Sequence, residues 1–312
     1  MLALDFVKAN RETVERAIRD KGVTLDLDEV LTLDAEVRAG KTEIDRLRAE
    51  RNAVSARFKD ASPQEKADLG RQAKEAGARA SALEADLTGK EEQLRALMLQ
   101  LPGIPYEGAP VGPDESFNAV IRTVGEPPEF GFEPLDHVAL IEKNGWGDLS
   151  RVTQVSGSRT YCLKGRLALL ETKLMAWALE KIAAANFTPI TVPAIAREQA
   201  FLNQGQFPGH REETYELPND DLWLAGTAEV VLTSLHAGEI IEHDKLPILY
   251  AGYSPCFRRE AGSAGKDVRG LLRVHQFVKV EQYVICEADE AQSAETAFSA
   301  SQITYCSTFT NW

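Results

Sequence analysis

Hydrophobic residues recur alternately three and four positions apart through two stretches of the N-terminal third of the chain. This is the heptad spacing by which one helix packs along another in a coiled coil, so it restricts the fold of this region strongly. The first run comprises Val30, Leu33, Val37, Gly40, Ile44, Leu47, Arg51, Val54 and Phe58. The second comprises Leu69, Ala73, Ala76, Ala80, Leu83, Leu87, Lys90, Leu94, Leu97 and Leu101. Only Gly40, Arg51 and Lys90 interrupt the pattern, which predicts two long helices.

A helix-start signal separates the two runs. Ser62, Pro63 and Glu65 have the spacing of a capping box with proline in the first helical turn. The chain is therefore predicted to turn back near Asp60 and to form an antiparallel helical hairpin. Helices of about thirty residues that rise about 1.5 Å per residue would project on the order of 45 Å.

Charge is distributed unevenly along this hairpin. The whole chain has a formal charge of -13, which disfavours a polyanionic partner. The distal part is nevertheless net basic, with Arg51, Arg57, Lys59, Lys66, Arg71, Lys74 and Arg79 against Asp60, Glu65, Asp68 and Glu75. A basic tip suits a phosphate backbone. A mixed-charge solvated face or a dimerisation coiled coil accounts for the same residues, and spacing alone leaves these interpretations open.

The chain is long enough for two structural units, with 312 residues of which 44% are hydrophobic and 27% charged. A stretch rich in proline and glycine follows Leu101, so we expect one domain at residues 1–103 and another at 104–312. In the second, apolar residues recur at helical spacing from Leu167 to Ala185. Strand-like segments follow at 187–193, 222–224 and 248–250, around Phe257, and at 274–284. An α+β domain built on an antiparallel sheet is the simplest architecture.

The first residues and the cysteines bear on the cellular setting. Charge appears as early as Asp5, so we expect no signal peptide, no membrane span and a cytoplasmic protein. The four cysteines show no Cys-x-x-Cys pair and no histidine at ligand spacing. This pattern disfavours a disulfide framework and a structural zinc site. We expect the cysteines to be reduced and mostly buried.

Two arginine-bearing segments flank a long loop in the second domain. The order of residues 257–260, 261–270 and 271–277 predicts a strand, a flexible loop and a returning strand. Arginine matches phosphate and carboxylate oxygens bidentately, so Arg258 and Arg273 suit a site that joins two anionic reactants. Cross-strand ion pairs among Arg258, Glu260 and Arg273 would explain the same residues.

These segments resemble motif 2 of class II aminoacyl-tRNA synthetases, in the form belonging to bacterial-type seryl-tRNA synthetases. Residues 226–229 resemble the family's serine-binding loop. Residues 187–193 resemble motif 1, whose proline, here Pro193, lies at the family's dimer interface. The similarity runs from Met1 to about Ala288 with order and spacing preserved. It implies a tRNA-binding domain with a coiled-coil arm, followed by a class II catalytic core with an antiparallel sheet flanked by helices.

The resemblance implies a homodimeric serine–tRNA ligase that forms seryl-adenylate from L-serine and ATP with Mg²⁺ and then charges tRNA(Ser). The implied catalytic residues are Arg258 and Arg273. The implied ATP-binding residues are Arg258, Arg259, Glu260, Val274 and Phe277, with Phe277 stacked on adenine. The implied serine-binding residues are Thr227, Ala228, Glu229 and Glu281, with Glu281 at the substrate hydroxyl. The implied tRNA contacts are Arg51, Arg57, Lys59, Arg71, Lys74, Lys266 and Arg269.

The last residues depart from the family pattern. The family continues to a Glu-x-x-Ser-Cys-Ser segment that binds Mg²⁺ and ATP, and then to motif 3. Here Cys306 and Ser307 weakly resemble the end of that segment, Gln302 stands where a metal-binding glutamate is expected, and motif 3 is absent. We therefore expect a core that is incomplete at its C-terminal end, with unknown metal ligands.

Three alternatives follow from these features. A silent tRNA-binding paralogue, or a truncated form without full activity, would share everything up to Ala288. A ligase that charges a carrier protein would share the active site but lacks such an arm, so the heptads argue against it. A purely structural coiled-coil protein leaves residues 227–229 and 258–277 unexplained.

Overall fold

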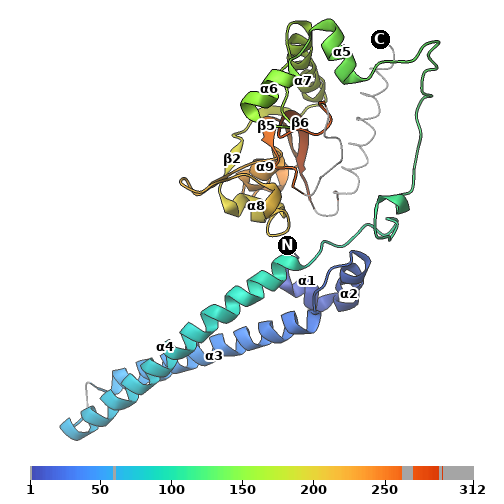
Figure 1. Cartoon of the computed structure of the whole chain (residues 1–312). Coiled ribbons are helices and arrows are strands. Elements are labelled where there is room, and N and C mark those ends of the chain that lie inside the picture. Colours follow the sequence, from blue (N-terminus) through green and yellow to red (C-terminus); the bar gives the residue numbers. More distant parts are fainter. Residues whose placement is uncertain (1, 59–60, 262–269, 288–289, 291–312) are drawn as a thin grey trace. The chain divides into compact units, whose positions relative to one another are not determined.

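The computed structural model describes residues 2–58, 61–261, 270–287 and 290 (Figure 1). The chain separates into two compact units, Met1–Gly125 and Glu126–Trp312. The first contains α1 (Leu4–Ala9), α2 (Arg11–Asp20), α3 (Leu27–Arg57), α4 (Pro63–Gln100) and the 3-10 helix η1 (Glu115–Phe117). The helices α3 and α4 lie side by side as an antiparallel hairpin, which confirms the predicted arm.

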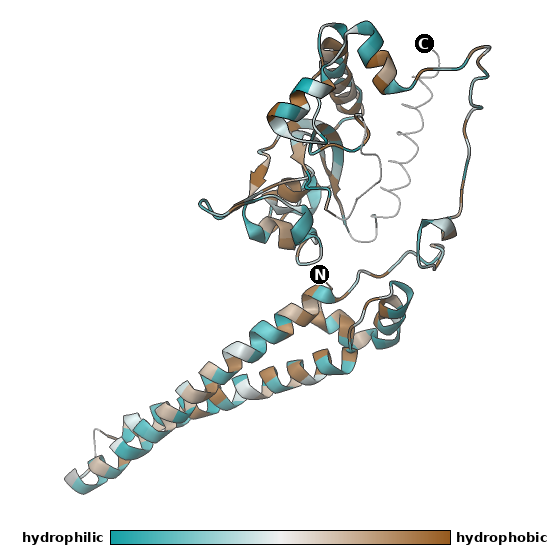
Figure 2. Cartoon of the chain, viewed as in Figure 1, coloured by the Kyte–Doolittle hydropathy of each residue, from teal (hydrophilic) through white to brown (hydrophobic). Residues whose placement is uncertain are grey.

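The heptad residues form the contact between the two long helices. Figure 2 shows hydrophobic and hydrophilic residues alternating along both of them. The buried seam residues are Val30, Val37, Ile44, Leu47 and Val54 of α3 and Leu69, Ala76, Ala80 and Leu87 of α4. At the base of the hairpin, α1 and α2 add Val7, Val14 and Ile18 to a common core with Met98. The arm is thus held by side-chain burial along its length.

The interruptions of the heptad pattern have separate explanations. A methyl group at Gly40 would lie 2.9 Å from Cδ1 of Leu87, so glycine there lets the helices approach closely. The Lys90 ammonium lies 3.1 Å from the Glu36 carboxylate of α3, and this hydrogen bond raises the pKa of Lys90. Arg51 and Phe58 are exposed, so the apolar seam ends before the tip of the arm.

Polar contacts fix both ends of the arm. The main-chain nitrogen of Ser62 donates to Oε2 of Glu65 (2.8 Å), and the Glu65 nitrogen donates to Oγ of Ser62 (3.4 Å), which confirms the capping box. The bond from the Ser62 hydroxyl lowers the pKa of Glu65. At the base, the buried Asp34 carboxylate accepts from Lys8 (2.6 Å) and Arg38 (2.9 Å), which ties α1 to α3.

The second unit contains helices, two small sheets and short 3-10 turns. Its helices are α5 (His137–Asn144), α6 (Leu149–Ser156), α7 (Arg166–Ala184), α8 (Glu198–Gln204), α9 (Glu229–Leu235), η2 (Arg211–Glu213) and η3 (His243–Lys245). Its strands are β1 (Thr188–Thr191), β2 (Ile195–Ala196), β3 (Glu216–Leu217), β4 (Leu222–Leu224), β5 (Ile248–Phe257) and β6 (Gln276–Ile285). None of the described helices is both long and apolar enough to cross a membrane.

The longest strands, β5 and β6, pair antiparallel over ten residues each, from Ile248 opposite Ile285 to Phe257 opposite Gln276. The two segments predicted around 248–250 and Phe257 are therefore one strand. β1 pairs with β5 in parallel and completes a sheet of order β1-β5-β6, on which α7 and α9 pack. A second sheet, of order β2-β4-β3, is antiparallel throughout. The predicted α+β fold is confirmed, with β1 as its one parallel addition among the described strands.

Replacing Leu47 with alanine tests the seam. Leu47 is 2% exposed, so Leu47→Ala should lower the free energy of unfolding by about 2–5 kcal/mol through lost burial and a cavity. Urea denaturation followed by circular dichroism measures this change. The control Asp45→Ala removes an exposed residue of the same turn and should change stability by less than about 0.5 kcal/mol. Equal effects of the two changes would contradict the coiled-coil packing.

Candidate functional site

The site is built on one face of the β5–β6 pair. Side chains alternate along a strand, so Phe277, Lys279 and Glu281 of β6 share a face. Their partners on β5 are Cys256, Ser254 and Gly252, respectively, which are small. The small β5 residues lie beneath the longer β6 side chains and leave room above the sheet for a ligand.

A first pocket, of about 600 Å³, opens where the two strands meet the connecting loop. Its lining residues are Glu213, Arg258, Glu260, Ala261, Leu271, Leu272, Arg273, Val274 and Phe277. The Arg258 guanidinium lies 5.4 Å from the centre of the Phe277 ring, within reach of a cation–π interaction. The pocket therefore brings together a cation, an aromatic face and the second arginine, Arg273.

An ion pair stands at the edge of this first pocket. Nη1 of Arg273 lies 3.4 Å from Oε2 of Glu260, so the predicted ion pair between these two residues is present, although both lie beyond the paired ends of β5 and β6. The segment around Arg273 is also supported from outside, because Nη1 of Arg159 donates to its main-chain oxygen (3.4 Å). The loop residues Lys266 and Arg269 lie outside the described residues.

A second pocket, of about 360 Å³, adjoins the first. Its lining residues are Gln204, Gly205, Gln206, His210, Glu213, Gly226, Thr227, Glu229, Arg258 and Lys279. Arg258 and Glu213 line both pockets. A methyl group at Gly226 would lie 3.2 Å from Cγ of Arg258 and 3.3 Å from the Phe257 oxygen, so glycine lets this loop pass close to Arg258. One arginine can therefore face ligands in both pockets at once.

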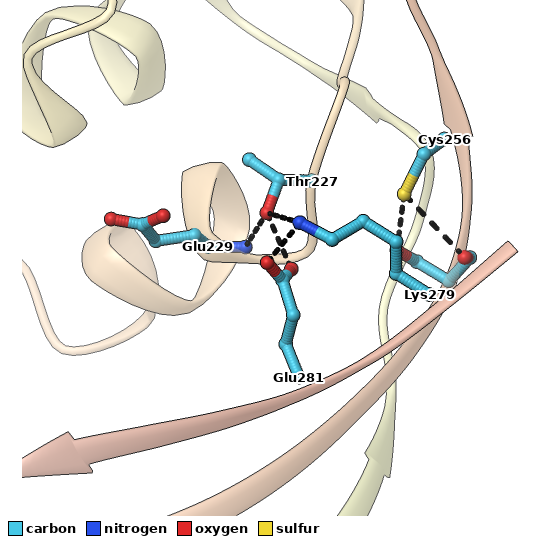
Figure 3. A network of polar contacts seen from close by, with 6 residues as sticks. Thr227, Glu229, Cys256, Lys279 and Glu281 are labelled. Carbon is cyan, nitrogen blue, oxygen red and sulfur yellow. Dashed lines mark hydrogen bonds and ion pairs between the residues drawn. The ribbon is translucent and has the colours of Figure 1, made fainter. Parts of the chain in front are cut away.

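A polar cluster of Thr227, Lys279 and Glu281 lies at the second pocket, whose wall includes Thr227 and Lys279 (Figure 3). The Thr227 hydroxyl donates to Oε2 of Glu281, and the Lys279 ammonium pairs with Oε1 of the same carboxylate. Lys279 also donates to Oγ1 of Thr227 (3.0 Å). The main-chain nitrogen of Glu229 donates to the same oxygen (3.3 Å), while its carboxylate extends away from the cluster. Three elements, the loop before α9, α9 itself and β6, thus meet at one threonine.

Comparison with known proteins assigns the chain to a family. Family models described as "Seryl-tRNA synthetase N-terminal domain" and "tRNA synthetase class II core domain (G, H, P, S and T)" match residues 1–105 and 214–309. The serine–tRNA ligase of Deinococcus radiodurans is 47% identical over 292 residues, which are 94% of this chain and 69% of that protein. The chain belongs to the seryl-tRNA synthetase family.

Other members of the seryl-tRNA synthetase family agree in sequence and fold. The Corynebacterium efficiens serine–tRNA ligase is 40% identical over 293 residues, covering 94% of this chain and 70% of that protein. A crystal structure of the Pyrococcus horikoshii synthetase complexed with ATP superposes with a TM-score of 0.84 at 32% identity. That match covers 96% of this chain and 73% of the other. The chain is thus similar to class II synthetases over nearly its whole length.

Most of the site residues predicted for this synthetase line the two pockets, but Arg259, Ala228 and Glu281 do not. Glu281 is connected to the second pocket through its bonds to Thr227 and Lys279. The side chain of Arg259 lines a separate pocket of about 550 Å³ with Arg211 and Trp223, because successive residues of an extended segment point to opposite sides. Its guanidinium lies 5.9 Å from the Tyr215 ring centre. Ala228 is buried at the start of α9 and supports the loop from behind.

Sequence reasoning missed Lys279, Glu213 and His210. Lys279 stands two positions before Glu281 in a predicted strand, so strict alternation would have placed both in one pocket. Glu213 ends the short 3-10 helix η2 and His210 immediately precedes it, and so short a helix leaves no comparable signal in residue spacing. Their place in the site depends on the tertiary fold.

The cysteine and metal expectations have different outcomes. Among the described cysteines only Cys256 is buried, whereas Cys162 is exposed, so the prediction of mostly buried cysteines is wrong. Burial raises the pKa of the Cys256 thiol, which therefore stays protonated beneath the pocket. In the described part of the chain, no group of three or more His, Cys, Asp and Glu side chains is arranged to hold a metal ion. Gln302 lies outside those residues.

Four of the seven predicted tRNA-binding residues lie along the distal arm. Arg51, Arg57, Arg71 and Lys74 are exposed on α3 and α4. Arg71 pairs with Asp68 (2.7 Å) on its own helix. Lys59 lies outside the described residues. These four side chains therefore place positive charge on the surface of the distal arm.

Gly252→Ala tests the packing beneath the second pocket. The added methyl group would lie 2.9 Å from Cδ1 of Leu232 and 3.2 Å from Cβ of Ala228. Overpacking of this kind should lower the free energy of unfolding by about 1–3 kcal/mol, as measured by urea denaturation. Gly89→Ala is the control, because nothing lies within 4 Å of its methyl group and the helix should gain about 0.5–1 kcal/mol. A stabilising Gly252→Ala change would contradict the close approach of α9 to β5.

Proposed function

We propose that this chain activates L-serine with ATP to give seryl-adenylate and transfers the seryl group to tRNA(Ser). The observation that carries the proposal is the position of Arg258, which lines two adjoining pockets of different chemistry. The first pocket, with Phe277 and Arg273, suits a nucleotide, and the Pyrococcus horikoshii relative was crystallised with ATP. The second, with Thr227 and Glu229, suits a small amino acid.

The proposed chemistry needs no protein nucleophile. The serine carboxylate attacks the α-phosphorus of ATP, the bond to the bridging oxygen breaks, and pyrophosphate leaves. A hydroxyl of the terminal tRNA ribose then attacks the seryl carbonyl, and AMP leaves. Both reactants of the first step are anionic, so Arg258 accelerates it by holding the carboxylate and the α-phosphate together.

Within this proposal the first pocket holds ATP. Phe277 stacks on adenine, the main chain at Val274 lines the adenine, Glu260 faces the adenine amino group, and Arg273 reaches the phosphates. Arg259 is left out of the ATP site because its side chain lines a different pocket. Mg²⁺ enters as part of the ATP substrate. No step is assigned to a protein-held ion, since the described residues contain no arranged ligand group.

The second pocket would select serine through Glu281. A carboxylate that bonds the substrate hydroxyl discriminates against an analogue lacking it more strongly than size exclusion does. The loop at Thr227, Ala228 and Glu229 would receive the substrate amino group. The cationic Arg258 at the junction of the pockets directs the substrate carboxylate toward ATP.

The two functional parts proposed here are a tRNA-binding part at residues 1–103 and a catalytic part at 104–312. A homodimer would form around Pro193. Exposed leucines of α7, Leu169, Leu170 and Leu174, and the position of β1 at the end of its sheet support this assembly. A protein that charges tRNA for translation would work in the cytoplasm.

Serine-dependent exchange of pyrophosphate into ATP tests the activation step. The wild-type chain should catalyse exchange, and Arg258→Ala should lower kcat/KM for serine by about a hundredfold or more, because a developing anionic charge loses its donor. The control Arg151→Ala changes an exposed arginine of α6 and should leave the exchange rate unchanged.

The result also separates the two candidate functions. No exchange by the wild-type chain, with tRNA(Ser) still bound, would favour a tRNA-binding protein without activation. Loss of thermal stability in Arg258→Ala, rather than of binding, would favour the ion-pair interpretation of Arg258.

The salt dependence of tRNA binding tests the arm. In a triple alanine variant of Arg51, Arg71 and Lys74, the slope of log affinity against log salt for tRNA(Ser) should fall by roughly 2–3, because each lost phosphate contact contributes about 0.7–0.9. Fluorescence anisotropy at several salt concentrations measures the slope.

A triple alanine variant of Lys41, Arg46 and Arg48 is the matched control. All three residues lie on α3, nearer the base of the arm. They pair with Glu91, Glu43 and Glu84, respectively, at 2.7, 2.7 and 3.0 Å. The control should keep the wild-type slope. An equal loss of slope in both variants would show that overall charge, and not the distal arm, governs binding.

A further inference from the structure

The Lys279 ammonium occupies the centre of the polar cluster in the second pocket (Figure 3). It donates to Oγ1 of Thr227 (3.0 Å) and pairs with Oε1 of Glu281. The Lys279 and Glu281 side chains are 28% and 21% exposed, so their charges are partly withdrawn from water. An ion pair at this depth is shielded less by solvent than a surface pair, and it restrains both side chains.

The hydrogen-bonding capacity of Thr227 is fully used in this arrangement. A hydroxyl has one hydrogen to donate and two lone pairs to accept with. Its lone pairs receive the Lys279 ammonium and the main-chain nitrogen of Glu229, and its hydrogen is donated to Glu281. These three bonds hold the Thr227 hydroxyl in one orientation, with its hydrogen directed at Glu281.

The Glu281 carboxylate, in contrast, retains accepting capacity. An ionised carboxylate has about four lone-pair sites, and Lys279 and Thr227 use one on each oxygen. Two donors that hold two different oxygens fix the plane of the carboxylate. The remaining lone pairs are then held in one orientation beside Thr227 and Lys279, which line the second pocket, and they can accept from a hydroxyl donor.

We propose that Lys279 is a positioning residue that makes this site selective for a hydroxyl-bearing amino acid. It holds Glu281 and Thr227 as one unit, so the Glu281 carboxylate keeps one orientation toward the substrate hydroxyl. This inference rests on the proposed function, since it takes Glu281 as the group that reads the serine hydroxyl. The sheet supports it, because Gly252 and Ser254 opposite Glu281 and Lys279 leave the two side chains room to meet.

Paired ligands test the proposal by binding rather than by turnover. A stable sulfamoyl analogue of seryl-adenylate and its alanyl counterpart differ only in the hydroxyl, and isothermal titration calorimetry gives both Kd values. The wild-type chain should prefer the seryl analogue. Lys279→Met should lower that preference by about tenfold, almost entirely through weaker seryl binding, as expected for one charge-assisted hydrogen-bond arrangement. The Kd for ATP should stay unchanged.

Further variants separate positioning from general damage. Thr227→Val should lower the preference similarly, and the double variant should lower it no further, because both changes release the same carboxylate. Lys279→Arg should restore part of the preference. Lys245→Met, at an exposed lysine paired with Glu242 (2.8 Å), should change neither Kd. Thermal melting confirms that each variant is folded, and Thr227→Val provides the test if Lys279→Met does not fold.

Each other outcome overturns the inference in a recognisable way. If Lys279→Met keeps the wild-type preference for the seryl analogue, the Glu281 carboxylate is oriented without Lys279. Tighter binding of both analogues would show that Lys279 occupies the place of the substrate ammonium and is displaced on binding. If the two single variants' losses of preference for the seryl analogue multiply in the double variant, Lys279 and Thr227 act independently of each other. If the wild-type chain binds neither analogue, the proposed function fails and this inference fails with it.

Discussion

The antiparallel pairing of β5 with β6 is the constraint on which the site depends. Ten residues of each strand are paired, which fixes the register of every side chain between Phe257 and Gln276 at one end and Ile248 and Ile285 at the other. A shift of one residue would turn Phe277 and Lys279 away from the pockets, because strand side chains alternate between faces. The same pairing puts small β5 residues beneath long β6 ones, and this difference in size leaves space above the sheet.

Arginine then connects the two halves of the site. Arg258 follows β5 directly and lines both pockets, while Gly226 lets the neighbouring loop pass close to it. At the second pocket, the positive charge of Lys279 is paired with the negative charge of Glu281. Arg258 thus lines both pockets, whereas Lys279 is bonded to a neighbouring carboxylate, a difference that residue type alone does not reveal.

The arm is stabilised by contacts that follow from local sequence, unlike the sheet. Its contacts are made by residues at heptad spacing on two adjacent helices, and its ends are fixed by local bonds at Ser62 and by the buried Asp34. Charged side chains cover the surface of its distal part. A strongly acidic chain can in this way present a basic surface at one place, because helical repetition separates the packed face from the solvated one.

The sequence by itself determined the arm, the position of its turn, the α+β class of the second unit and the family, because heptads, caps and motif order are encoded by neighbours along the chain. It also indicated Arg258, Arg273, Val274 and Phe277 as one group. Only the tertiary structure separated Arg259 from that group and added Glu213 and Lys279. It alone gave Thr227 its hydrogen-bond partners, since those contacts join residues more than fifty positions apart and depend on strand register.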